Sequence, residues 1–384
     1  MPSWLKEGRG SLCGANVSLL LREMGITKPL LVAGERTKNV FFARTGMRLP
    51  VFDAFHPNPD LQDCVAGAAL YQEKECDGLI SVGGGSAMDT AKGIKALLMT
   101  DIVHVRANQL PPEGKVPHLA IPGTAGTGAE TTAVAVLYED GQKLSVDHPA
   151  LLPDGVLLDG SLLDTLPEYH RKSCAMDALA QGIESWWAKK ATPGSRIHAE
   201  RAIRGVLDNL TAYLQGDRKA QDEMLHAAYE SGVAILTTRT TAAHAMSYQI
   251  TKKLGAAHGH ACMLTLPHLW AHLAAQAEYQ PMLTELAHIL GGDSYKGGAQ
   301  GDLYRRCAAL APTEMPIVFH ECGQIPTRAE MDAANAPWAY FMVWHTSWLT
   351  DSSKGNTPES LRAIYRDSSF VTLHQLPDFI ERDE

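Results

Sequence analysis

The segment ISVGGGSAMDTAKGIKALL, residues 80–98, decides the fold of this chain. A short apolar run enters three glycines at 83–85, and a helical pattern follows at once. Glycine lets the backbone turn tightly and approach a ligand closely, because no side chain intervenes. Ser86 is a preferred N-cap residue, and Asp89 lies three residues further on. The exposed N–H groups of such a first helical turn suit an anion, typically a pyrophosphate.

A second Gly-rich loop lies in HLAIPGTAGTGAETTAVAVL, residues 118–137. Here too an apolar strand leads into small and hydroxylated residues, including Thr124 and Thr127. Two such loops, each at the end of a strand, fit a dinucleotide that lies across the crest of a parallel sheet. The spacing is not G-x-G-x-x-G, so the usual dinucleotide fingerprint is absent.

The pattern of the chain changes near residue 160. Before it, strand-like runs alternate with helical runs, which predicts an α/β sheet domain. After Leu166 and Pro167 the sequence is Ala-rich and has a helical period. We therefore predict an α/β dinucleotide-binding domain over residues 1–162 and an all-helical domain over residues 163–384.

Composition favours a soluble enzyme. The 384 residues are 45% hydrophobic and 20% charged, which allows large cores and argues against disorder. The net charge of −9 and the lack of a dense Lys/Arg run disfavour a nucleic-acid partner. Seven scattered cysteines without a C-x-x-C pair predict a reduced, cytoplasmic protein. The first residues lack an apolar signal region and no apolar run reaches about 18 residues, so we expect neither export nor membrane spanning.

Candidate metal ligands lie in the helical half. Asp177 and Gln181 are four residues apart and share one helix face. His244 lies before a Gly-containing break, and His258 and His260 follow it. One Asp and two His can bind a divalent metal and leave a position for a substrate oxygen. A single such His is more often a hydrogen-bonded imidazole, so the hypothesis depends on the set.

Four segments in order carry a resemblance to a known family: GGGSAMDTAKG, IPGTAGTGAE, MDALAQGIES and HAMSY…HGHACMLTLPH. Together they resemble the iron-dependent (group III) alcohol dehydrogenase family, and the similarity extends to KGNTPESLRAIY at 354–365. The resemblance implies an N-terminal α/β domain that binds NAD(P), a helical domain that holds the metal, and an active site in the cleft between them. It also implies a homodimer. Glycerol dehydrogenases and dehydroquinate synthases share this fold but differ in their metal motifs.

The resemblance implies a ligand set with one departure from the family. Its four metal ligands, one Asp and three His, correspond to Asp177, Gln181, His244 and His258. The Gln carbonyl is a weaker, neutral ligand, so we expect Fe²⁺ or Zn²⁺ to be bound weakly or to be absent. Tyr248 stands where the broad family has a His that relays a proton. It is therefore the candidate proton donor, although an ordinary tyrosine pKa lies near 10.

Cofactor choice also follows from the resemblance. NAD-specific relatives tend to carry an acidic residue where this chain has Gly34, and Arg36 or Lys38 can pair with a 2′-phosphate. We therefore expect NADPH to be preferred over NADH, with Glu35 as a complication. The residues implied to contact the cofactor are Gly34, Arg36, Asn58, Gly84, Gly85, Ser86, Asp89, Thr124, Thr127 and Lys143.

A narrower resemblance concerns the substrate. The segments ESWWAKKATPGS, KLSVDHPALLPD and TTRTTAAHAMSYQIT are similar to the phosphonoacetaldehyde reductase branch, which makes 2-hydroxyethylphosphonate in phosphonate natural-product biosynthesis. Arg239, with Thr240 beside it, is the predicted phosphonate-binding group, because its planar fork binds two oxygens. A salt bridge is the alternative role for Arg239. Phosphonopyruvate reduction to phosphonolactate, general aldehyde reduction and non-catalytic nucleotide binding also stay open.

Overall fold

The computed structural model describes residues 6–112, 116–290, 318–322 and 340–343. Contacts divide the chain into two compact units, residues 1–263 with 280–295 and residues 264–279 with 296–384. The domain boundary predicted after residue 162 falls inside the first unit and stays a prediction. The segment 354–365, where the family resemblance ends, lies outside the described residues.

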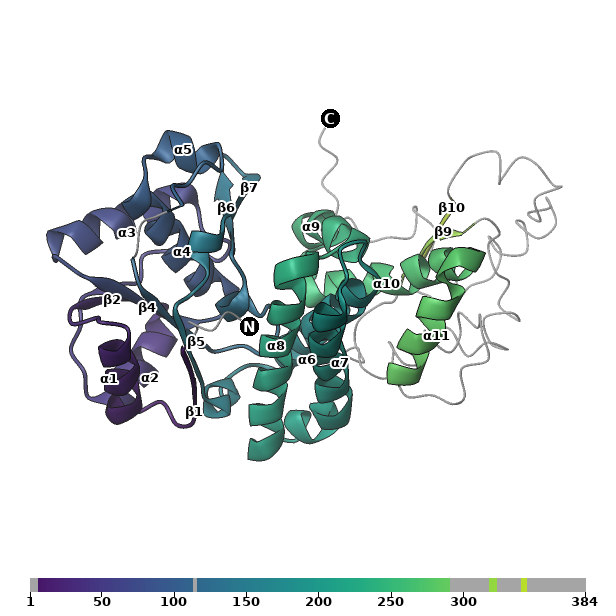
Figure 1. Cartoon of the computed structure of the whole chain (residues 1–384), viewed down its shortest axis with the longest axis horizontal. Helices are drawn as coiled ribbons and strands as arrows, with labels where there is room; N and C mark the ends of the chain where they lie inside the picture. Colours follow the sequence, from purple (N-terminus) through teal and green to yellow (C-terminus); the bar gives the residue numbers. More distant parts are fainter. Residues whose placement is uncertain (1–5, 113–115, 291–317, 323–339, 344–384) are drawn as a thin grey trace, which may run out of the picture. The chain divides into compact units, whose positions relative to one another are not determined.

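A six-stranded sheet in the order β1-β8-β5-β4-β2-β3 forms the N-terminal half (Figure 1). All of its pairings are parallel. The central strands are buried along their whole length, which explains why the sequence shows continuous apolar runs there rather than alternation. The strands are β1 (Lys6–Arg9), β2 (Pro29–Ala33), β3 (Val51–Phe52), β4 (Gly78–Gly83), β5 (His118–Pro122) and β8 (Gly155–Leu158).

Helices cover both faces of this sheet and confirm the α/β prediction. One apolar cluster joins α1 and α2 to the sheet around Phe41 and Ile80, and another joins α3 and α4 around Leu61 and Ile94. The core of this half therefore consists of the two faces of the sheet. The helices are α1 (Gly14–Glu23), α2 (Glu35–Thr45), α3 (Leu61–Glu73), α4 (Gly85–Met99) and α5 (Ile102–Arg106).

The turn before α4 differs from the prediction in one detail. The N-cap residue is Gly84 and not Ser86, so the predicted cap was wrong. Gly83 has φ 148, a conformation that side chains rarely allow, and a Cβ atom on Gly84 would lie 3.1 Å from Thr124. The glycines therefore make the turn and let the two Gly-rich loops pack against each other.

An antiparallel hairpin, β6 (Val134–Glu139) and β7 (Gln142–Asp147), follows the second Gly-rich loop. The apolar run at residues 133–137 indicates β6, but no comparable run in the sequence marks its partner β7. The signal lay in the dipeptide Asp140-Gly141, whose φ angles of 50 and 71 are those of the type I′ turn that joins two adjacent strands. The hairpin carries Lys143 and Asp147 to the cavity described below.

The helices that follow confirm the predicted helical C-terminal half. They are α6 (Glu168–Trp187), α7 (Pro193–Leu214), α8 (Arg218–Thr238), α9 (Ala242–Leu254), α10 (His258–Ala274) and α11 (Gln280–Ile289), and short 3₁₀ turns are η1 (Ala129–Thr131), η2 (Pro149–Leu151), η3 (Gly160–Leu163) and η4 (Ala277–Tyr279). The expectation of helices alone needs a correction, because β9 (Val318–Cys322) and β10 (Tyr340–Val343) form a parallel pair in the second unit. Among the described residues, no helix is long and apolar enough to cross a membrane.

Candidate active site

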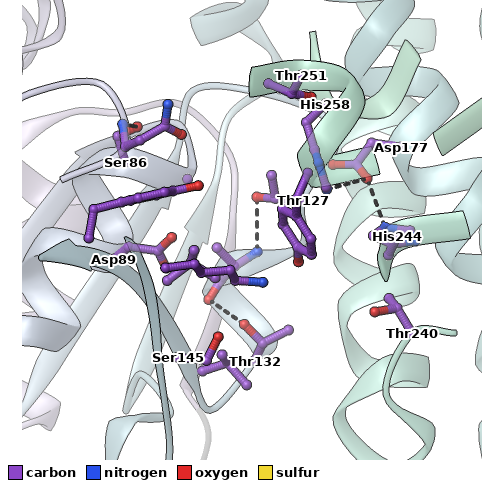
Figure 2. Close-up of a pocket in the computed structure, with 18 of the residues that line it drawn as sticks. Ser86, Asp89, Thr127, Thr132, Ser145, Asp177, Thr240, His244, Thr251 and His258 are labelled. Carbon is purple, nitrogen blue, oxygen red and sulfur yellow. Dashed lines mark hydrogen bonds and ion pairs between the residues drawn. The ribbon is translucent and has the colours of Figure 1, made fainter. Parts of the chain in front are cut away.

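A cavity of about 1010 Å³ in the first unit brings together most of the predicted site residues (Figure 2). Those that line it are Asn58, Gly85, Ser86, Asp89, Thr127, Lys143, Asp177, Gln181, Arg239, Thr240, His244, Tyr248 and His258. Four of the residues implied to contact the cofactor are not among the lining residues: Gly34, Arg36, Gly84 and Thr124. The strongest sequence signals therefore meet in one space although they are up to 200 residues apart.

The sheet side of the cavity begins at the N-terminus of α4. Gly85 and Ser86 belong to its first turn, where backbone N–H groups have no partner within the helix. Thr127 lies between this turn and the helical side chains in Figure 2, and its Oγ1 accepts a hydrogen bond from the N–H of Ala129 at 3.3 Å. Small residues and unpaired N–H donors together suit a pyrophosphate.

Asp89 lies one turn further along α4, where its half-buried side chain lines the cavity. Burial raises the pKa of its carboxyl to about 7, although the nearby Lys92 ammonium opposes this shift. Lys92 itself is anchored to the hairpin, because its Nζ donates to Thr132 Oγ1 at 3.0 Å and to the carbonyl of Val134 at 2.9 Å. The ammonium of Lys92 and a backbone hydrogen bond with Val136 favour the charged form of Asp89.

Lys143 and Tyr248 connect the two sides of the cavity. The Nζ of Lys143 lies 3.3 Å from the centroid of the Tyr248 ring, a cation–π contact. The same ring stacks on His258 with centroids 5.5 Å apart. Burial lowers the pKa of Lys143 to about 8 and raises the pKa of Tyr248 to about 12. At neutral pH, Lys143 is therefore charged and the Tyr248 phenol keeps its proton.

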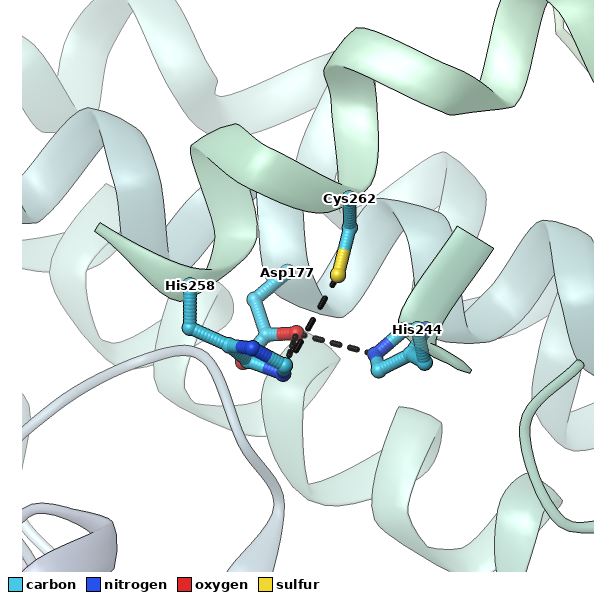
Figure 3. Close-up of side chains that lie close together, drawn as sticks. All are labelled: Asp177, His244, His258 and Cys262. Carbon is cyan, nitrogen blue, oxygen red and sulfur yellow. Dashed lines mark hydrogen bonds and ion pairs between the residues drawn. The ribbon is translucent and has the colours of Figure 1, made fainter. Parts of the chain in front are cut away.

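The helix side of the cavity contains the predicted metal ligands. His244 Nε2 lies 3.2 Å from Asp177 Oδ1, and His258 Nε2 lies 3.8 Å from the same oxygen (Figure 3). Metal bonds of about 2.0–2.3 Å in a tetrahedral site place ligand atoms about 3.3–3.8 Å apart. One carboxylate and two imidazoles at these separations fit a divalent metal such as Fe²⁺ or Zn²⁺.

Outer contacts fix both imidazoles with Nε2 towards the cluster. His244 Nδ1 donates to Glu184 Oε2, and Ser247 Oγ gives its own proton to the carbonyl of His244 at 2.7 Å. Ser247 Oγ can therefore only accept from His258 Nδ1, which lies 3.1 Å away. Protonated Nδ1 atoms leave Nε2 as the ligand atom, the usual arrangement around a bound metal. Sequence reasoning missed Glu184 and Ser247, since a Glu or Ser on a helix carries no distinguishing signal.

Glu184 also positions the start of α9. Its Oε1 accepts hydrogen bonds from the N–H groups of Thr241 at 3.1 Å and Ala243 at 2.9 Å. A carboxylate at a helix N-terminus satisfies orphan donors and complements the helix dipole. Glu184 therefore fixes both the orientation of the His244 ring and the position of the first turn of α9, the helix that carries His244.

The amide of Gln181 is held by groups outside the metal cluster. Its Nε2 donates to the carbonyl of Thr127 at 3.1 Å. Its Oε1 lies 2.8 Å from Ser231 Oγ and shares the single hydroxyl proton with the carbonyl of Ala228, which lies 2.7 Å from the same Oγ. Burial would raise the pKa of Asp177, but His258, His244 and a hydrogen bond from Gln181 keep it below its usual range.

Cys262 joins the cluster and was missing from the sequence-based ligand set. Its Sγ lies 4.0 Å from His258 Nε2, and the ligand atoms of Cys262, Asp177, His244 and His258 all lie within 4.8 Å of one another. Burial raises the pKa of the Cys262 thiol, but His244 and His258 outweigh it and lower the pKa overall. The signal was available, since Cys262 follows His258 by one helical turn.

Arg239 ends helix α8 with φ 64 and is already engaged in an ion pair. Its Nη2 lies 2.7 Å from Asp147 Oδ1, and its Nη1 donates to the carbonyl of Leu236 at 2.9 Å. The salt bridge considered as the alternative role is thus present. The side chain is still 41% exposed and lines the cavity, so its remaining donors can meet an anion.

The loop after β2 has its cations paired as well. Arg36 Nη1 donates to the carbonyl of Thr165 at 2.7 Å, and Lys38 Nζ lies 2.5 Å from Asp53 Oδ2. Gly34 is the N-cap residue of α2, and a Cβ atom there would meet nothing within 4 Å. The loop is open at Gly34, and the two neighbouring cations have protein partners.

Comparison with known proteins identifies the family. The model of the iron-containing alcohol dehydrogenases matches residues 3–160, and the model of their C-terminal region matches residues 172–331. This chain belongs to the iron-containing alcohol dehydrogenase family. It is therefore an oxidoreductase that acts on CH–OH and carbonyl groups, in a family that binds NAD(H) and a divalent metal.

Individual relatives differ in their substrates. The chain is 32% identical to a phosphonoacetaldehyde reductase of Streptomyces viridochromogenes, over 69% of this chain and 73% of the relative. It is 30% identical to an NAD-dependent methanol dehydrogenase of Bacillus methanolicus, over 74% and 77%. A crystal structure of sulfoacetaldehyde reductase from Bifidobacterium kashiwanohense in complex with NAD⁺ matches with a TM-score of 0.71 and 26% identity, over 87% of this chain and 89% of the other.

Proposed function

We propose that this chain uses NADPH to reduce a small anionic aldehyde. The first candidate substrate is phosphonoacetaldehyde, whose product is the alcohol 2-hydroxyethylphosphonate. The observation that carries the proposal is that Arg239 lines the same cavity as the α4 N-terminus and the Asp177–His244–His258 cluster. The cavity thus offers the N-terminus of α4 to a cofactor phosphate, the metal cluster to a carbonyl group and Arg239 to an anionic tail.

The residues divide into those that hold the cofactor and those that hold the metal. Gly85, Ser86 and Thr127 bind the pyrophosphate, and NADPH supplies the hydride for the carbonyl carbon. Asp177, His244 and His258 would hold the metal, with Gln181 next to them, and a divalent ion bound there would supply Lewis-acid polarisation of the carbonyl group.

Tyr248 is the proposed proton donor. Its pKa, raised to about 12 by burial, keeps the phenol protonated at neutral pH. An alkoxide is a much stronger base than the resulting phenolate, so transfer to the reduced oxygen is downhill. The ammonium of Lys143 over the ring stabilises the phenolate while it exists.

Arg239 and Thr240 are proposed to hold the anionic tail. Arg239 is tied to Asp147, which fixes its position and leaves part of the guanidinium fork for the ligand. A sulfonate has the same arrangement of oxygens as a phosphonate with one charge less. Sulfoacetaldehyde is therefore the second candidate, favoured by the similarity to the sulfoacetaldehyde reductase structure.

The preference for NADPH rests on Gly34. A carboxylate at this position would repel a 2′-phosphate, and none is present. Arg36 and Lys38 keep unused donors beside their protein partners, so they remain available to the phosphate.

The test is an NADPH-absorbance assay with phosphonoacetaldehyde, sulfoacetaldehyde, phosphonopyruvate and the neutral propanal. We expect kcat/KM for phosphonoacetaldehyde to exceed that for propanal by about 10- to 100-fold, the value of a charge-assisted hydrogen-bond pair. Equal kcat/KM values for the charged and neutral aldehydes would overturn the proposal that the substrate is anionic. If no carbonyl compound were turned over, the result would favour a nucleotide-binding protein without catalytic activity.

A further inference from the structure

We propose that Cys262 is the fourth protein ligand of the metal site and that Gln181, at the family's fourth ligand position, holds Asp177 from outside. This inference rests on the metal site of the proposed function. It concerns the residues that form the site and not the substrate.

The first argument is the position of the thiol. Cys262 is fully buried on α10, one turn after His258, so both side chains leave the helix on the same face (Figure 3). Its Sγ lies 4.0 Å from His258 Nε2 and within 4.8 Å of the ligand atoms of Asp177 and His244. A single ion at the centre of these four atoms needs only small side-chain adjustments to reach bonds of about 2.0–2.3 Å.

The second argument is the orientation of the Gln181 amide. The carbonyl of Thr127 can only accept a hydrogen bond, so the nitrogen of the amide must face it, and the oxygen then faces Ser231. Gln181 lies one turn after Asp177 on the same face of α6, so its amide stays beside the Asp177 carboxylate while both of these contacts are kept. As a ligand, Gln181 would have to turn its oxygen towards the ion and would lose these contacts.

The third argument is the chemistry of the donor set. A carboxylate, two imidazoles and a thiolate carry two negative charges and neutralise a divalent ion in a buried site, whereas an amide in place of the thiolate leaves one charge uncompensated. A thiolate also shifts preference from Fe²⁺ towards Zn²⁺ and other ions that favour sulfur. The loss of the family's histidine at position 181 is thus compensated from another helix.

The experiment is cobalt substitution of the full-length reduced protein. Cobalt bound by a thiolate absorbs strongly in the near ultraviolet, and this band does not depend on activity. We expect the wild type to show the band and Cys262→Ser to lack it, with Zn²⁺ affinity more than about 100-fold weaker, above the range typical of outer residues. Cys13→Ser is the matched control, because Cys13 is the N-cap residue of α1 and lies outside the cluster.

Gln181→Leu separates the two roles. It should keep the thiolate band and lose Zn²⁺ affinity by about 10- to 100-fold, as expected for a residue that only orients a ligand. A wild type that binds cobalt without the band, or Cys262→Ser with unchanged Zn²⁺ affinity, would overturn the assignment of Cys262 alone. A wild type that binds no metal at all would overturn both this assignment and the metal part of the proposed function.

Discussion

The two sides of the cavity are built on different principles. The sheet side consists of Gly85, Ser86 and Thr127, which offer backbone N–H groups and small hydroxyls from the first turn of α4 and from the second Gly-rich loop. The helix side consists of Asp177, His244 and His258, charged or ionisable side chains from three helices. The sheet side tolerates little bulk at Gly84, since a Cβ atom there would lie 3.1 Å from Thr124. The helix side instead depends on outer contacts that hold each ring.

The two sides of the cavity therefore differ in the substitutions that they tolerate. A backbone site loses function when its turn is filled, whereas a side-chain site can lose one ligand and recruit another from a neighbouring helix. Gln181 stands where the resemblance implies a histidine, and the thiol of Cys262 lies next to the other three proposed ligands. This difference can be tested by substituting residues on one side of the cavity and measuring ligand binding on the other side.

Replacing His258 by Ala should have the largest effect. Removal of one imidazole should abolish metal retention and lower kcat by about 10³-fold, equivalent to about 4 kcal/mol of transition-state stabilisation. NADPH affinity, measured by fluorescence titration, should change less than about threefold, because the sheet side is untouched.

The matched control for this change is His260→Leu. His260 lies two residues further along α10, and its buried ring nitrogens have no hydrogen-bond partner among the described residues. Its metal content should equal that of the wild type. Full turnover of the His258→Ala protein without detectable metal would show that the helix side works without an ion.

Arg239→Ala should have the next largest effect. The KM for a phosphonate aldehyde should rise about 10- to 100-fold, while the KM for propanal stays unchanged, because only the anionic substrate loses a charge-assisted contact. Asp147→Asn is the control, since it removes the ion-pair partner of Arg239 and leaves the guanidinium in place. Equal losses on both aldehydes would assign Arg239 a structural role.

Gly34→Asp should change cofactor preference by about tenfold, or about 1.4 kcal/mol. The new carboxylate has room, because nothing lies within 4 Å of a Cβ atom at this position, and it should repel the 2′-phosphate of NADPH. Steady-state kcat/KM values with NADPH and NADH measure the ratio. The exposed Gly194, in the first turn of α7, provides the control Gly194→Asp, which should not alter it. A wild-type preference for NADH of tenfold or more would contradict this interpretation of the loop.

The smallest expected effect is on pH dependence. The folded pKa of Lys143 is lowered to about 8 by burial, so the ammonium is charged below pH 8 and neutral above it. The KM for NADPH should therefore rise about threefold to tenfold between pH 7 and pH 9. Lys143→Arg keeps the charge and should give a flat profile with a low KM. If the KM of the wild type for NADPH did not change with pH, the proposed contact between Lys143 and the cofactor would be contradicted.

Local sequence patterns were enough for the sheet and for its side of the cavity. Apolar runs that end in glycines predict strand-to-helix turns because only glycine adopts the angles found at Gly83. They did not predict the first residue of α4, because the N-cap residue is Gly84 and not Ser86. They also missed the β7 strand, although the Asp140-Gly141 turn indicated it.

The helices of the second half and the candidate ligands Asp177, His244 and His258 were predictable from the sequence. The sequence did not predict that Cys262 lies beside these ligands, that Glu184 and Ser247 orient the rings, or that the Gln181 amide faces Thr127, because these contacts depend on how the helices pack. The physical reason is that a 3.6-residue period fixes which side chains share a helix face but not how one helix is rotated against another. Contacts between residues 177 and 262 depend on that rotation, which the packing of α6, α9 and α10 sets.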